Sequence, residues 1–496
     1  MSERLIEQLK QREEHLKVLK EKGISPFGGR YAVDSSALLL HQKFAEIGPT
    51  PSSEEVSLAG RLVSKRLHGN VIFADIIDFS GKIQLYFGVN FLDKEKFKLL
   101  KYIDIGDIIG VKGQVFRTHK GELSLLVKEF NLLSKCLKPL PEKWHGLKDP
   151  ELRYRKRHLD LIMNPKVREL FVRRSLIIKT IRNYLDSIGF YEVETPTMNI
   201  IHGGANAKPF VTYHNALNLE LYLRIATELH LKRLLVGGFE RVYEIGRVFR
   251  NEGISTIHNP EFTSLEVYQA YADYTDMMQL AESIISRIAV EVLQNFSIEY
   301  KGHHINLKPP YRRVKMDELF HFYTGFNISK LRDRNISTHV AQKLGIKGAE
   351  KMTLPHILDK IFSTAVEPNL IEPTFVLDYP LECSPLAKKK EDDPTFTYRF
   401  ELFIGGFEIA NAFSELNDPY DQKERFLEQQ KNKEAGDEDA HPLDEDFLEA
   451  LEYGMPPAGG MGIGIDRLVM LLTDSSSIRE VILFPTLKPS PVEIHP

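Results

Sequence analysis

Two segments of the chain, 243–250 and 261–268, place charged and aromatic residues at alternate positions, as extended strands do. Side chains alternate between the two faces of a strand, so one face of each segment collects every second residue. These sets are Glu244, Gly246, Val248 and Arg250 on the first segment, and Phe262, Ser264, Glu266 and Tyr268 on the second. A half-buried structural hairpin would place apolar side chains on its inner face. The observed mixture suits either a polar ligand lying on a sheet or a surface ladder of salt bridges.

The loop between these segments, 251–260, is a second place where ligand chemistry is expected. It is too long for the two-residue turn of a tight hairpin, and it carries Glu252 and His258. Loops of this kind, held by a rigid scaffold, often carry function. We therefore expect the loop to take part in ligand binding.

Two glutamates on a further hairpin could hold a metal ion. A turn at Gly405-Gly406 pairs Phe403 with Glu408 and places Glu401 on the same face, diagonal to Glu408. Diagonal neighbours lie roughly 7–8 Å apart at the backbone, so two carboxylates can converge on one hard cation. Without a cation, two buried like charges would repel each other or take up a proton. Two exposed glutamates are the alternative, which the apolar sequence around them disfavours.

The same hairpin continues into polar residues that can join these glutamates only if the strand is irregular. In a regular strand Asn411, Phe413 and Glu415 would lie on the face opposite to Glu408. If all of them reach one site, a β-bulge or a local twist must lie between them.

Glycines before a helix indicate a phosphate site at residues 459–467, GGMGIGIDR. Such glycines leave backbone N–H groups accessible to a phosphate. The segment lacks the βαβ context and the ribose-binding acid of a dinucleotide fingerprint. Arg467 directly follows Asp466, and an arginine held by that aspartate would be aimed at a triphosphate.

The elements that must position these residues follow from periodicity. A helix is predicted over 165–188, followed by a strand that contains Pro196 and must therefore lie at a sheet edge or end there. A helix beside an edge strand is one form of dimer interface. Residues 275–375 read as mostly helical and amphipathic, without evident chemistry. Gly203-Gly204 is either an ordinary turn or a point of close approach to a ligand. The basic run 153–158 is either a solvated face or a contact to a nucleic-acid backbone.

Residues 56–135 read as five short strands that follow a charged helix over 2–22. Five strands of this length indicate a small closed β-barrel, most often an OB-fold, with a β-sandwich as the alternative. Bases stack on rings while cations meet phosphates, so rings and cations on the barrel favour an oligonucleotide surface. The residues concerned are Lys65, Arg66, Phe73, Gln84 and Arg117.

The composition limits the wider class of protein. A chain of 496 residues should divide into two to four domains. The formal charge of -4 means that any nucleic-acid surface must be local. Two cysteines, Cys136 and Cys383, provide neither a disulfide framework nor a metal cluster, so we expect a reducing, cytoplasmic setting. No apolar run approaches the roughly 20 residues that span a membrane, so no membrane partner is expected.

Three segments, in order, resemble the motifs of class II aminoacyl-tRNA synthetases. The helix with GFYEVETP (189–196) is similar to motif 1, FRNEGISTIHNPEF (249–262) to motif 2 and GMGIGIDR (460–467) to motif 3. The resemblance covers nearly the whole chain, barrel included. It is closest to bacterial-type lysyl-tRNA synthetases, with HGGANAKPF (202–210) and RFELFIGGFEIANAFSELNDP (399–419) as specific marks.

This resemblance implies a multidomain α+β protein that forms a homodimer. An OB-fold barrel that binds the anticodon would precede a catalytic domain built on an antiparallel sheet flanked by helices. The implied division is a helical extension over 1–50, the barrel over 51–138, a linker over 139–163 and the catalytic domain over 164–496.

The implied reaction activates L-lysine with ATP, releasing pyrophosphate, and transfers lysine from lysyl-adenylate to the 3′ end of tRNA(Lys). Arg250 would hold the ATP α-phosphate and the amino-acid carboxylate, where a fixed guanidinium stabilises the charge of in-line attack. The attacking carboxylate is already ionised, so no general base is needed and catalysis is mainly positioning.

The resemblance also assigns the remaining site residues. Arg250 and Arg467 would be catalytic, and ATP would contact Arg250, Glu252, His258, Phe262 and Arg467. Lysine would lie among Gly204, Glu228, Glu266, Tyr268, Asn411, Phe413 and Glu415. Glu401 and Glu408 would carry Mg²⁺, while Arg66, Phe73, Gln84 and Glu122 would read a U-rich anticodon. Carboxylates near the lysine ε-ammonium are expected because a buried cation needs charged partners.

Three other functions remain open at this point. An aspartyl- or asparaginyl-tRNA synthetase of the same subclass would need an arginine in the side-chain pocket, where this chain offers Glu266 and Glu415. A lysine transferase that acts on a protein would lack the barrel. A non-enzymatic tRNA-binding relative should have lost Arg250, Arg467 or the paired glutamates, and this chain keeps them.

Overall fold

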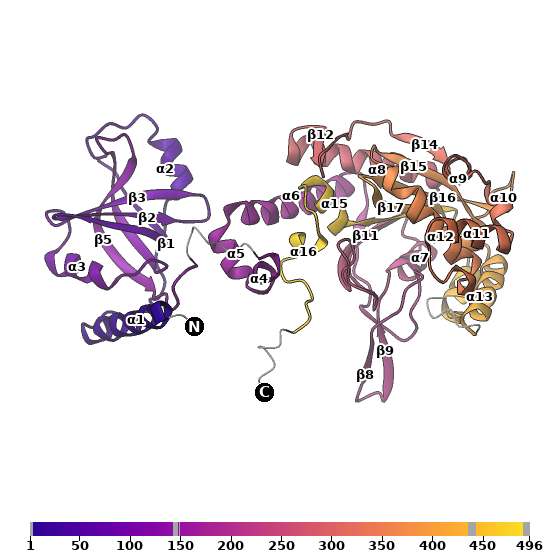
Figure 1. Ribbon diagram of the computed structural model, residues 1–496, viewed down its shortest axis with the longest axis horizontal. Coiled ribbons are helices and arrows are strands. Elements are labelled where there is room, and N and C mark those ends of the chain that lie inside the picture. The colour runs from indigo at the N-terminus through magenta and orange to yellow at the C-terminus, as the bar shows by residue number, and fades with distance from the viewer. Residues whose placement is uncertain (1–2, 142–146, 148, 435–442, 490–496) are drawn as a thin grey trace. The chain divides into compact units, whose positions relative to one another are not determined.

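The chain divides into two compact units, 1–148 and 149–496 (Figure 1). This computed structural model describes residues 3–141, 147, 149–434 and 443–489. Within those residues, no helix combines the length and the apolar character that a membrane crossing requires.

The first unit is a closed β-barrel whose strands follow the order β1-β2-β3-β5-β4. This closure confirms the predicted barrel over the alternative of a sandwich. The strands are β1 (Glu55–His68), β2 (Val71–Ile77), β3 (Lys82–Gly88), β4 (Ile108–Arg117) and β5 (Leu123–Ser134). Three helices accompany them, α1 (Glu3–Glu21), α2 (Ala37–Lys43) and α3 (Lys94–Leu99). Alternate residues such as Leu58, Leu85 and Leu125 fill the interior.

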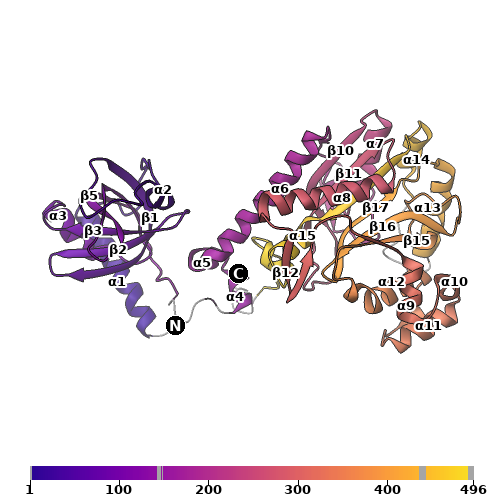
Figure 2. The same cartoon turned by 90° about the horizontal axis from the view of Figure 1, so that it is seen from above.

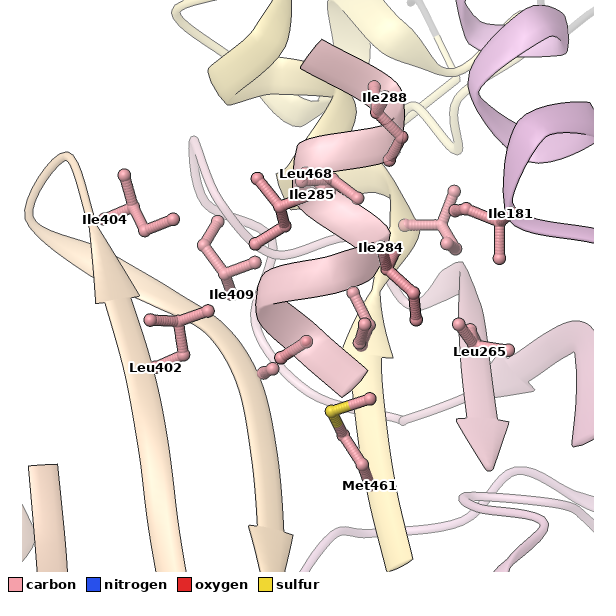
Figure 3. Packing of buried hydrophobic residues seen from close by; sticks show 14 of the residues in the cluster. Ile181, Leu265, Ile284, Ile285, Ile288, Leu402, Ile404, Ile409, Met461 and Leu468 are labelled. Atoms are coloured by element: carbon pink, nitrogen blue, oxygen red, sulfur yellow. The ribbon is translucent and has the colours of Figure 1, made fainter. Parts of the chain in front are cut away.

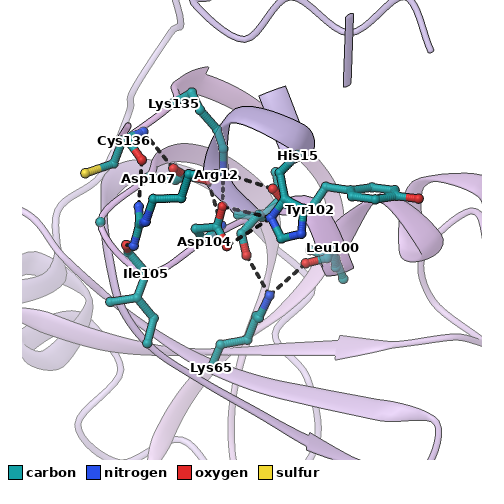
Figure 4. A network of polar contacts seen from close by, with 12 residues as sticks. Arg12, His15, Lys65, Leu100, Tyr102, Asp104, Ile105, Asp107, Lys135 and Cys136 are labelled. Carbon is teal, nitrogen blue, oxygen red and sulfur yellow. Dashed lines mark hydrogen bonds and ion pairs between the residues drawn. The ribbon is translucent and has the colours of Figure 1, made fainter. Parts of the chain in front are cut away.

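Helix α1 is attached to the barrel mainly by a polar network (Figure 4). Arg12 donates to two backbone carbonyl oxygens next to β4 and β5, at 2.7 and 2.6 Å. His15 Nδ1 lies 3.0 Å from Asp104, which also accepts from the buried Lys135. Lys135 in turn contacts Asp107 at 2.8 Å. Leu19 of the same helix is fully buried in the apolar core of this unit, so apolar and charged contacts both hold the helix in place.

The boundary between the units differs from the predicted linker over 139–163. Residues 150–163 form two helices of the second unit, α4 (Pro150–Arg155) and α5 (Arg157–Met163). Arg157 is buried, pairs with Asp160 at 2.8 Å, and donates to the backbone carbonyl oxygens of Arg479 and Leu483. Part of the basic run 153–158 thus serves internal packing, so it is not simply a solvated face.

The second unit is built on an eight-stranded sheet in the order β14-β15-β16-β17-β18-β11-β10-β6. Its strands are β6 (Tyr191–Glu192), β10 (Arg241–Phe249), β11 (Glu261–Ala270), β14 (Arg312–Lys315), β15 (Thr374–Pro380), β16 (Phe396–Ile404), β17 (Phe407–Ser414) and β18 (Ala458–Gly464). Neighbours are antiparallel, except that β6 runs parallel to β10 and β14 to β15. The predicted strand pair over 243–268 is confirmed as β10 and β11, and β6 takes the predicted edge position.

Helices and two smaller sheets complete this unit. The helices are α6 (Pro165–Ser187), α7 (Glu228–Val236), α8 (Tyr274–Ile288), α9 (Met316–Thr324), α10 (Ile328–Leu331), α11 (Arg334–Lys343), α12 (Leu354–Ala365), α13 (Pro419–Glu434), α14 (Glu445–Glu452), α15 (Ile465–Leu472) and α16 (Ile478–Val481). The smaller sheets contain β7 (Met198–Asn199), β8 (Val211–His214) and β9 (Leu219–Leu223), and β12 (Ser297–Tyr300) with β13 (His303–Asn306).

The two faces of the large sheet have opposite character. Helices α6 and α8 lie side by side over one face (Figure 2), and Ile284 and Ile285 of α8 pack there against Leu265, Leu402 and Met461 (Figure 3). Because side chains alternate, the intervening residues of the same strands point to the other face. That face carries the polar residues singled out above, so the apolar packing of one side positions the chemistry of the other.

Candidate active site

The polar face of the sheet borders a cavity of about 470 Å³. Its lining comes from β11, β16, β17, β18, the loop 251–260 and the starts of α7 and α15. The predicted residues that line it are Gly204, Glu228, Arg250, Glu252, His258, Phe262, Glu266, Tyr268, Glu401, Glu408, Asn411, Phe413 and Arg467. The remaining one, Glu415, is buried directly behind the wall beside Gly460 and Tyr268. One cavity thus brings the predicted ATP, lysine and metal residues together.

Strand β10 contributes less to this cavity than its pattern suggests. Glu244 is buried in an ion pair with Arg224 at 2.5 Å and also accepts a hydrogen bond from Thr195 Oγ1 at 2.7 Å. A Cβ added to Gly246 would lie 2.2 Å from Arg224 Nη2, so the glycine leaves room for the arginine side chain. Among the four residues predicted to share this face of β10, only Arg250, which directly follows the strand, lines the cavity. Glu244 therefore lies outside the cavity, and its ion pair is buried instead of belonging to a surface ladder.

One end of the cavity is cationic. The Arg250 guanidinium lies 5.2 Å from the centre of the Phe262 ring, within the range of a cation–π contact. Arg467 donates to Glu408 at 2.9 Å, and its Nη2 lies 3.1 Å from His258 Nε2. Partial burial and the Arg467 guanidinium lower the pKa of His258. A neutral His258 can accept from Arg467 through Nε2 while Nδ1 faces Ser255 Oγ at 2.8 Å.

The partner of Asp466 differs from the predicted one. Its carboxylate is buried and accepts from Arg174 Nη1 of α6 and from the Thr263 backbone N–H of β11, both at 2.6 Å. Adjacent residues of a helix point in different directions, so Asp466 does not hold Arg467. Instead it fixes α15 to α6 and β11, and this sets the position of the helix that carries Arg467.

A β-bulge resolves the conflict between Glu408 and the residues that follow it. Phe403 pairs with Glu408 as predicted, but Leu402 pairs with Ala410, which leaves Ile409 as an extra residue. Ile409 and Ala410 are both buried on the α8 side. The extra residue shifts the alternation by one, so Glu408 and Asn411 both reach the cavity. The predicted bulge is confirmed.

Glu401 and Glu408 form the acidic part of this strand pair. Glu401 accepts from Arg399 Nη2 at 2.6 Å, and Arg399 Nε donates to Asn411 at 3.2 Å. Burial raises the pKa of Glu401 to about 7, and the Glu408 charge adds to the rise against the effect of Arg399. Across the described parts of the chain, no three His, Cys, Asp or Glu side chains form a metal cage. A pair of carboxylates without a cage suits Mg²⁺, which keeps waters and takes phosphate oxygens as further ligands.

The other end of the cavity is acidic. Glu266 accepts from the Thr227 backbone N–H at 3.0 Å, and burial raises its pKa to about 7. Burial raises the pKa of Glu415 to about 8, against the effect of a neighbouring lysine. Gly204 has φ +86°, and an added Cβ would lie 3.2 Å from the Cβ of Glu228. Gly204 thus packs closely against Glu228 and lines the cavity.

Sequence reasoning missed several residues of the site. Lys232 is fully buried between Glu228 and Glu415, and Arg224 and Arg399 hold polar strand residues as described above. Asp359 of α12 lines the cavity from a segment that showed no evident chemistry. Each is a charged residue within an amphipathic pattern, where a solvated position is the ordinary expectation. The sequence carries no signal that would have distinguished them.

The barrel of the first unit brings four further predicted residues close to one another. Arg66 of β1 and Phe73 of β2 are register partners, and the Phe73 ring meets Tyr86 edge-to-face at 5.3 Å. Gln84 of β3 accepts from Ser124 Oγ at 2.9 Å. Glu122 precedes β5, the neighbour of β3.

Two other barrel cations, Lys65 and Arg117, contact backbone carbonyl groups of neighbouring loops. Lys65 donates to the backbone carbonyl oxygens of Leu100 and Ile103, at 2.9 and 2.6 Å. Arg117 donates to the carbonyl oxygens of Ala45 and Gly121, at 2.6 and 2.7 Å. Both cations therefore secure loops of the unit.

Comparison with known proteins identifies the family. The model "tRNA synthetases class II (D, K and N)" matches residues 149–488, and "OB-fold nucleic acid binding domain" matches residues 56–133. The lysine–tRNA ligase of Moorella thermoacetica is 56% identical over 476 residues, 96% of each chain. That of Pelotomaculum thermopropionicum is 56% identical over 490 residues, 98% of this chain and 96% of the relative. The chain belongs to the lysine–tRNA ligase family of class II tRNA synthetases.

Proposed function

We propose that this protein activates L-lysine with ATP and transfers it to tRNA(Lys). The observation that carries the proposal is the polarity of the one cavity: acidic at Glu228 and Glu266, cationic at Arg250 and Arg467. Lysine carries an ε-ammonium at the end of its side chain, and at the other end an α-ammonium and a carboxylate on the same carbon. Such a molecule matches an acidic wall that faces two arginines.

The acidic wall would bind the two ammonium groups of lysine. Gly204 and Glu228 would meet the α-ammonium, while Glu266, Tyr268 and Glu415 would surround the ε-ammonium. Asn411 and Phe413 complete the lining on β17. An uncharged or anionic side chain would leave buried carboxylates unpaired, which is costly. This cost would exclude aspartate and asparagine, the other amino acids of the matched family.

The cationic end would bind ATP. Phe262 would stack on the adenine ring, Glu252 would accept from its amino group, and His258 would contact the distal phosphates. Arg250 and Arg467 would stabilise the negative charge that builds up as the lysine carboxylate attacks the α-phosphate. Glu401 and Glu408 would hold Mg²⁺, which when bound neutralises phosphate charge. The chain's own contribution is mainly orientation and fixed charge.

The barrel would read the anticodon through Arg66, Phe73, Gln84 and Glu122. Single-stranded bases are recognised by stacking on rings and by hydrogen bonds to their edges. Charging of tRNA accompanies translation, so we place the protein in the cytoplasm. Its two cysteines are unpaired, which fits a reducing compartment.

A homodimer is part of the proposal. The strand β6 forms one edge of the large sheet. Large apolar side chains are exposed around it and on the hairpin of β8 and β9, which projects from the body of its unit (Figure 1); they are Leu176, Tyr191, Met198, Val211 and Tyr213. Clustered apolar exposure of this kind is typical of an interface. Analytical ultracentrifugation should give twice the chain mass.

Amino-acid-dependent exchange between ATP and pyrophosphate tests the function directly. We expect lysine alone among the twenty amino acids to drive exchange, followed by lysylation of tRNA(Lys). Exchange driven by aspartate or asparagine would assign the protein to the other branches of its family. Tight tRNA binding without any exchange would support a non-enzymatic role instead.

A further inference from the structure

Lys232 of α7 is a buried charge within the acidic wall. Its Nζ has no solvent exposure and lies 2.5 Å from Glu228 Oε1, one helical turn earlier. It also forms an ion pair with Glu415 Oε2, whose side chain is likewise fully buried. The same ammonium lies 5.3 Å from the centre of the Phe413 ring. A single cation therefore joins α7, which carries one end of the acidic wall, to the residue that follows β17.

Full burial of Lys232 is unusual, because lysine is almost never fully buried unless it is paired. Burial disfavours the Lys232 cation, but Glu228 and Glu415 outweigh burial and raise its pKa above the ordinary value. The groups that face the trio from the neighbouring strand β11 are Glu266 and Tyr268. Three carboxylates and one ammonium thus share a buried volume.

The arrangement leaves one oxygen of Glu415 available. Neither Glu415 oxygen has a hydrogen-bond partner within the described parts of the chain, and Oε1, unlike Oε2, is not part of the ion pair with Lys232. Oε1 lies beside Gly460, where an added Cβ would come within 2.0 Å of it. Gly460 itself lines the cavity. Oε1 therefore lies at the cavity wall, while the other oxygen of the same carboxylate is held by Lys232.

We infer that Lys232 is a positioning residue for lysine recognition: it favours the ionised form of Glu415 and holds Glu415 and Glu228 in the places where they meet the two ammonium groups of the substrate. This inference rests on the proposed function. Without the cation, three carboxylates would share one desolvated site, and the most buried would take up a proton. A neutral Glu415 would no longer offer the ε-ammonium a charged partner.

The variant Lys232→Met tests this inference in the full-length protein. We expect the KM for lysine in ATP–pyrophosphate exchange to rise about tenfold or more, because a charged partner is lost, while the KM for ATP changes less than about twofold. Discrimination between lysine and norleucine, which lacks the ε-ammonium, should fall. Lys232→Arg keeps a cation and should restore most of the lysine affinity. Lys17→Met, which removes an exposed lysine from an i,i+4 pair with Glu21, is the matched control.

The pH profile separates positioning from mere structural support. Glu415 has a pKa of about 8 with Lys232 beside it, and binding of the ε-ammonium requires its ionised form. In Lys232→Met the pH above which the KM for lysine levels off should move upward, since a group with a higher pKa must then lose its proton. Lys232→Arg should keep the parent profile.

The outcomes are distinct. If the parent shows no lysine-dependent exchange, the proposed function fails, and this inference fails with it. If the parent is active but Lys232→Met keeps the parent's KM for lysine and pH profile, only the role of Lys232 is overturned. An equal loss for lysine and norleucine, or an equal rise of both KM values, would likewise overturn it. Should Lys232→Met not fold, as judged by circular dichroism, the same profile measured on Lys232→Gln decides.

Discussion

At the scale of single residues, the proposed stabilisation of negative charge in the reaction depends on Arg250, which lies over the Phe262 ring at the cationic end of the cavity. Replacement of Arg250 by alanine removes the guanidinium that would stabilise negative charge at the α-phosphate. We expect kcat for ATP–pyrophosphate exchange to fall by roughly 10²- to 10³-fold, the cost of losing one preorganised charge-stabilising group. Binding of tRNA, measured by filter retention, should change little.

Arg247 supplies the control for this experiment. It lies on the same strand, three residues earlier, but is half exposed and 3.6 Å from Glu261. Exposed ion pairs contribute little to stability, so Arg247→Ala should retain exchange near the parent rate. Exchange in Arg250→Ala at the rate of Arg247→Ala would contradict the role of Arg250.

The buried carboxylates Glu266 and Glu415 should make the KM for lysine depend on pH. Burial raises the pKa of Glu266 to about 7 and that of Glu415 to about 8. The lysine ammonium binds their ionised forms, so below these values binding must also release protons. The KM for lysine should therefore fall as pH rises from about 6 to 8.5, most steeply between about 7 and 8. The KM for ATP, measured in parallel, corrects for effects of pH on the enzyme as a whole. A KM for lysine that does not change over this range would contradict the role of Glu266 and Glu415 in binding the ammonium.

At the scale of elements, the sequence predicts those parts that follow from strand periodicity. The alternation of Ile83, Leu85 and Phe87 indicates one of the five short strands that together predict the barrel. The spacing around Gly405-Gly406 predicts the pairing of Phe403 with Glu408, which the structure has. The need for a bulge follows from the same rule, because two sets of polar residues would otherwise face opposite sides. Periodicity does not locate the extra residue, Ile409, because its position depends on packing against α8.

Strand and helix periodicity does not predict ion pairs between residues of segments that are distant in the sequence. Lys232 sits in a helix pattern that equally fits a solvated lysine, and Glu415, its second partner, is remote in sequence. For Asp466 the nearest arginine in sequence was the wrong choice, since its partner Arg174 comes from α6. Ion pairs depend on which elements pack together, and a single sequence does not supply that information.

Strand β18 allows a test of how closely the elements of the site are packed. An added Cβ at Gly460 would lie 2.0 Å from Glu415 Oε1 and 2.4 Å from Tyr268 Cε1. Gly460→Ala should therefore lower the free energy of unfolding by about 1–3 kcal/mol and raise the KM for lysine, because the two side chains must move. At Gly462, two residues along the same face, the nearest atoms are 4.0 Å away. Gly462→Ala should keep the parent melting temperature, and equal melting temperatures for the two variants would contradict the steric argument.

At the scale of the whole molecule, the chain separates recognition of tRNA from activation of the amino acid. Each unit has its own hydrophobic core, centred on the barrel in the first and on the large sheet in the second. The cavity is lined by residues of the second unit, and the proposed anticodon residues belong to the first. A change on the barrel should therefore leave the tRNA-independent half of the reaction intact.

Phe73→Ala tests this separation in the full-length protein. The Phe73 ring is half-buried between His68 and Tyr86, with ring centres 6.0 and 5.3 Å away. Stacking of one base on such a ring contributes about 1–3 kcal/mol, so kcat/KM for tRNA charging should fall roughly 5- to 150-fold. Lysine-dependent ATP–pyrophosphate exchange should keep the parent rate, because it needs no tRNA. Phe322→Ala, which removes an exposed ring from α9 of the second unit, should leave both activities unchanged. A loss of exchange in Phe73→Ala would instead mean that the barrel acts on the catalytic unit even without tRNA.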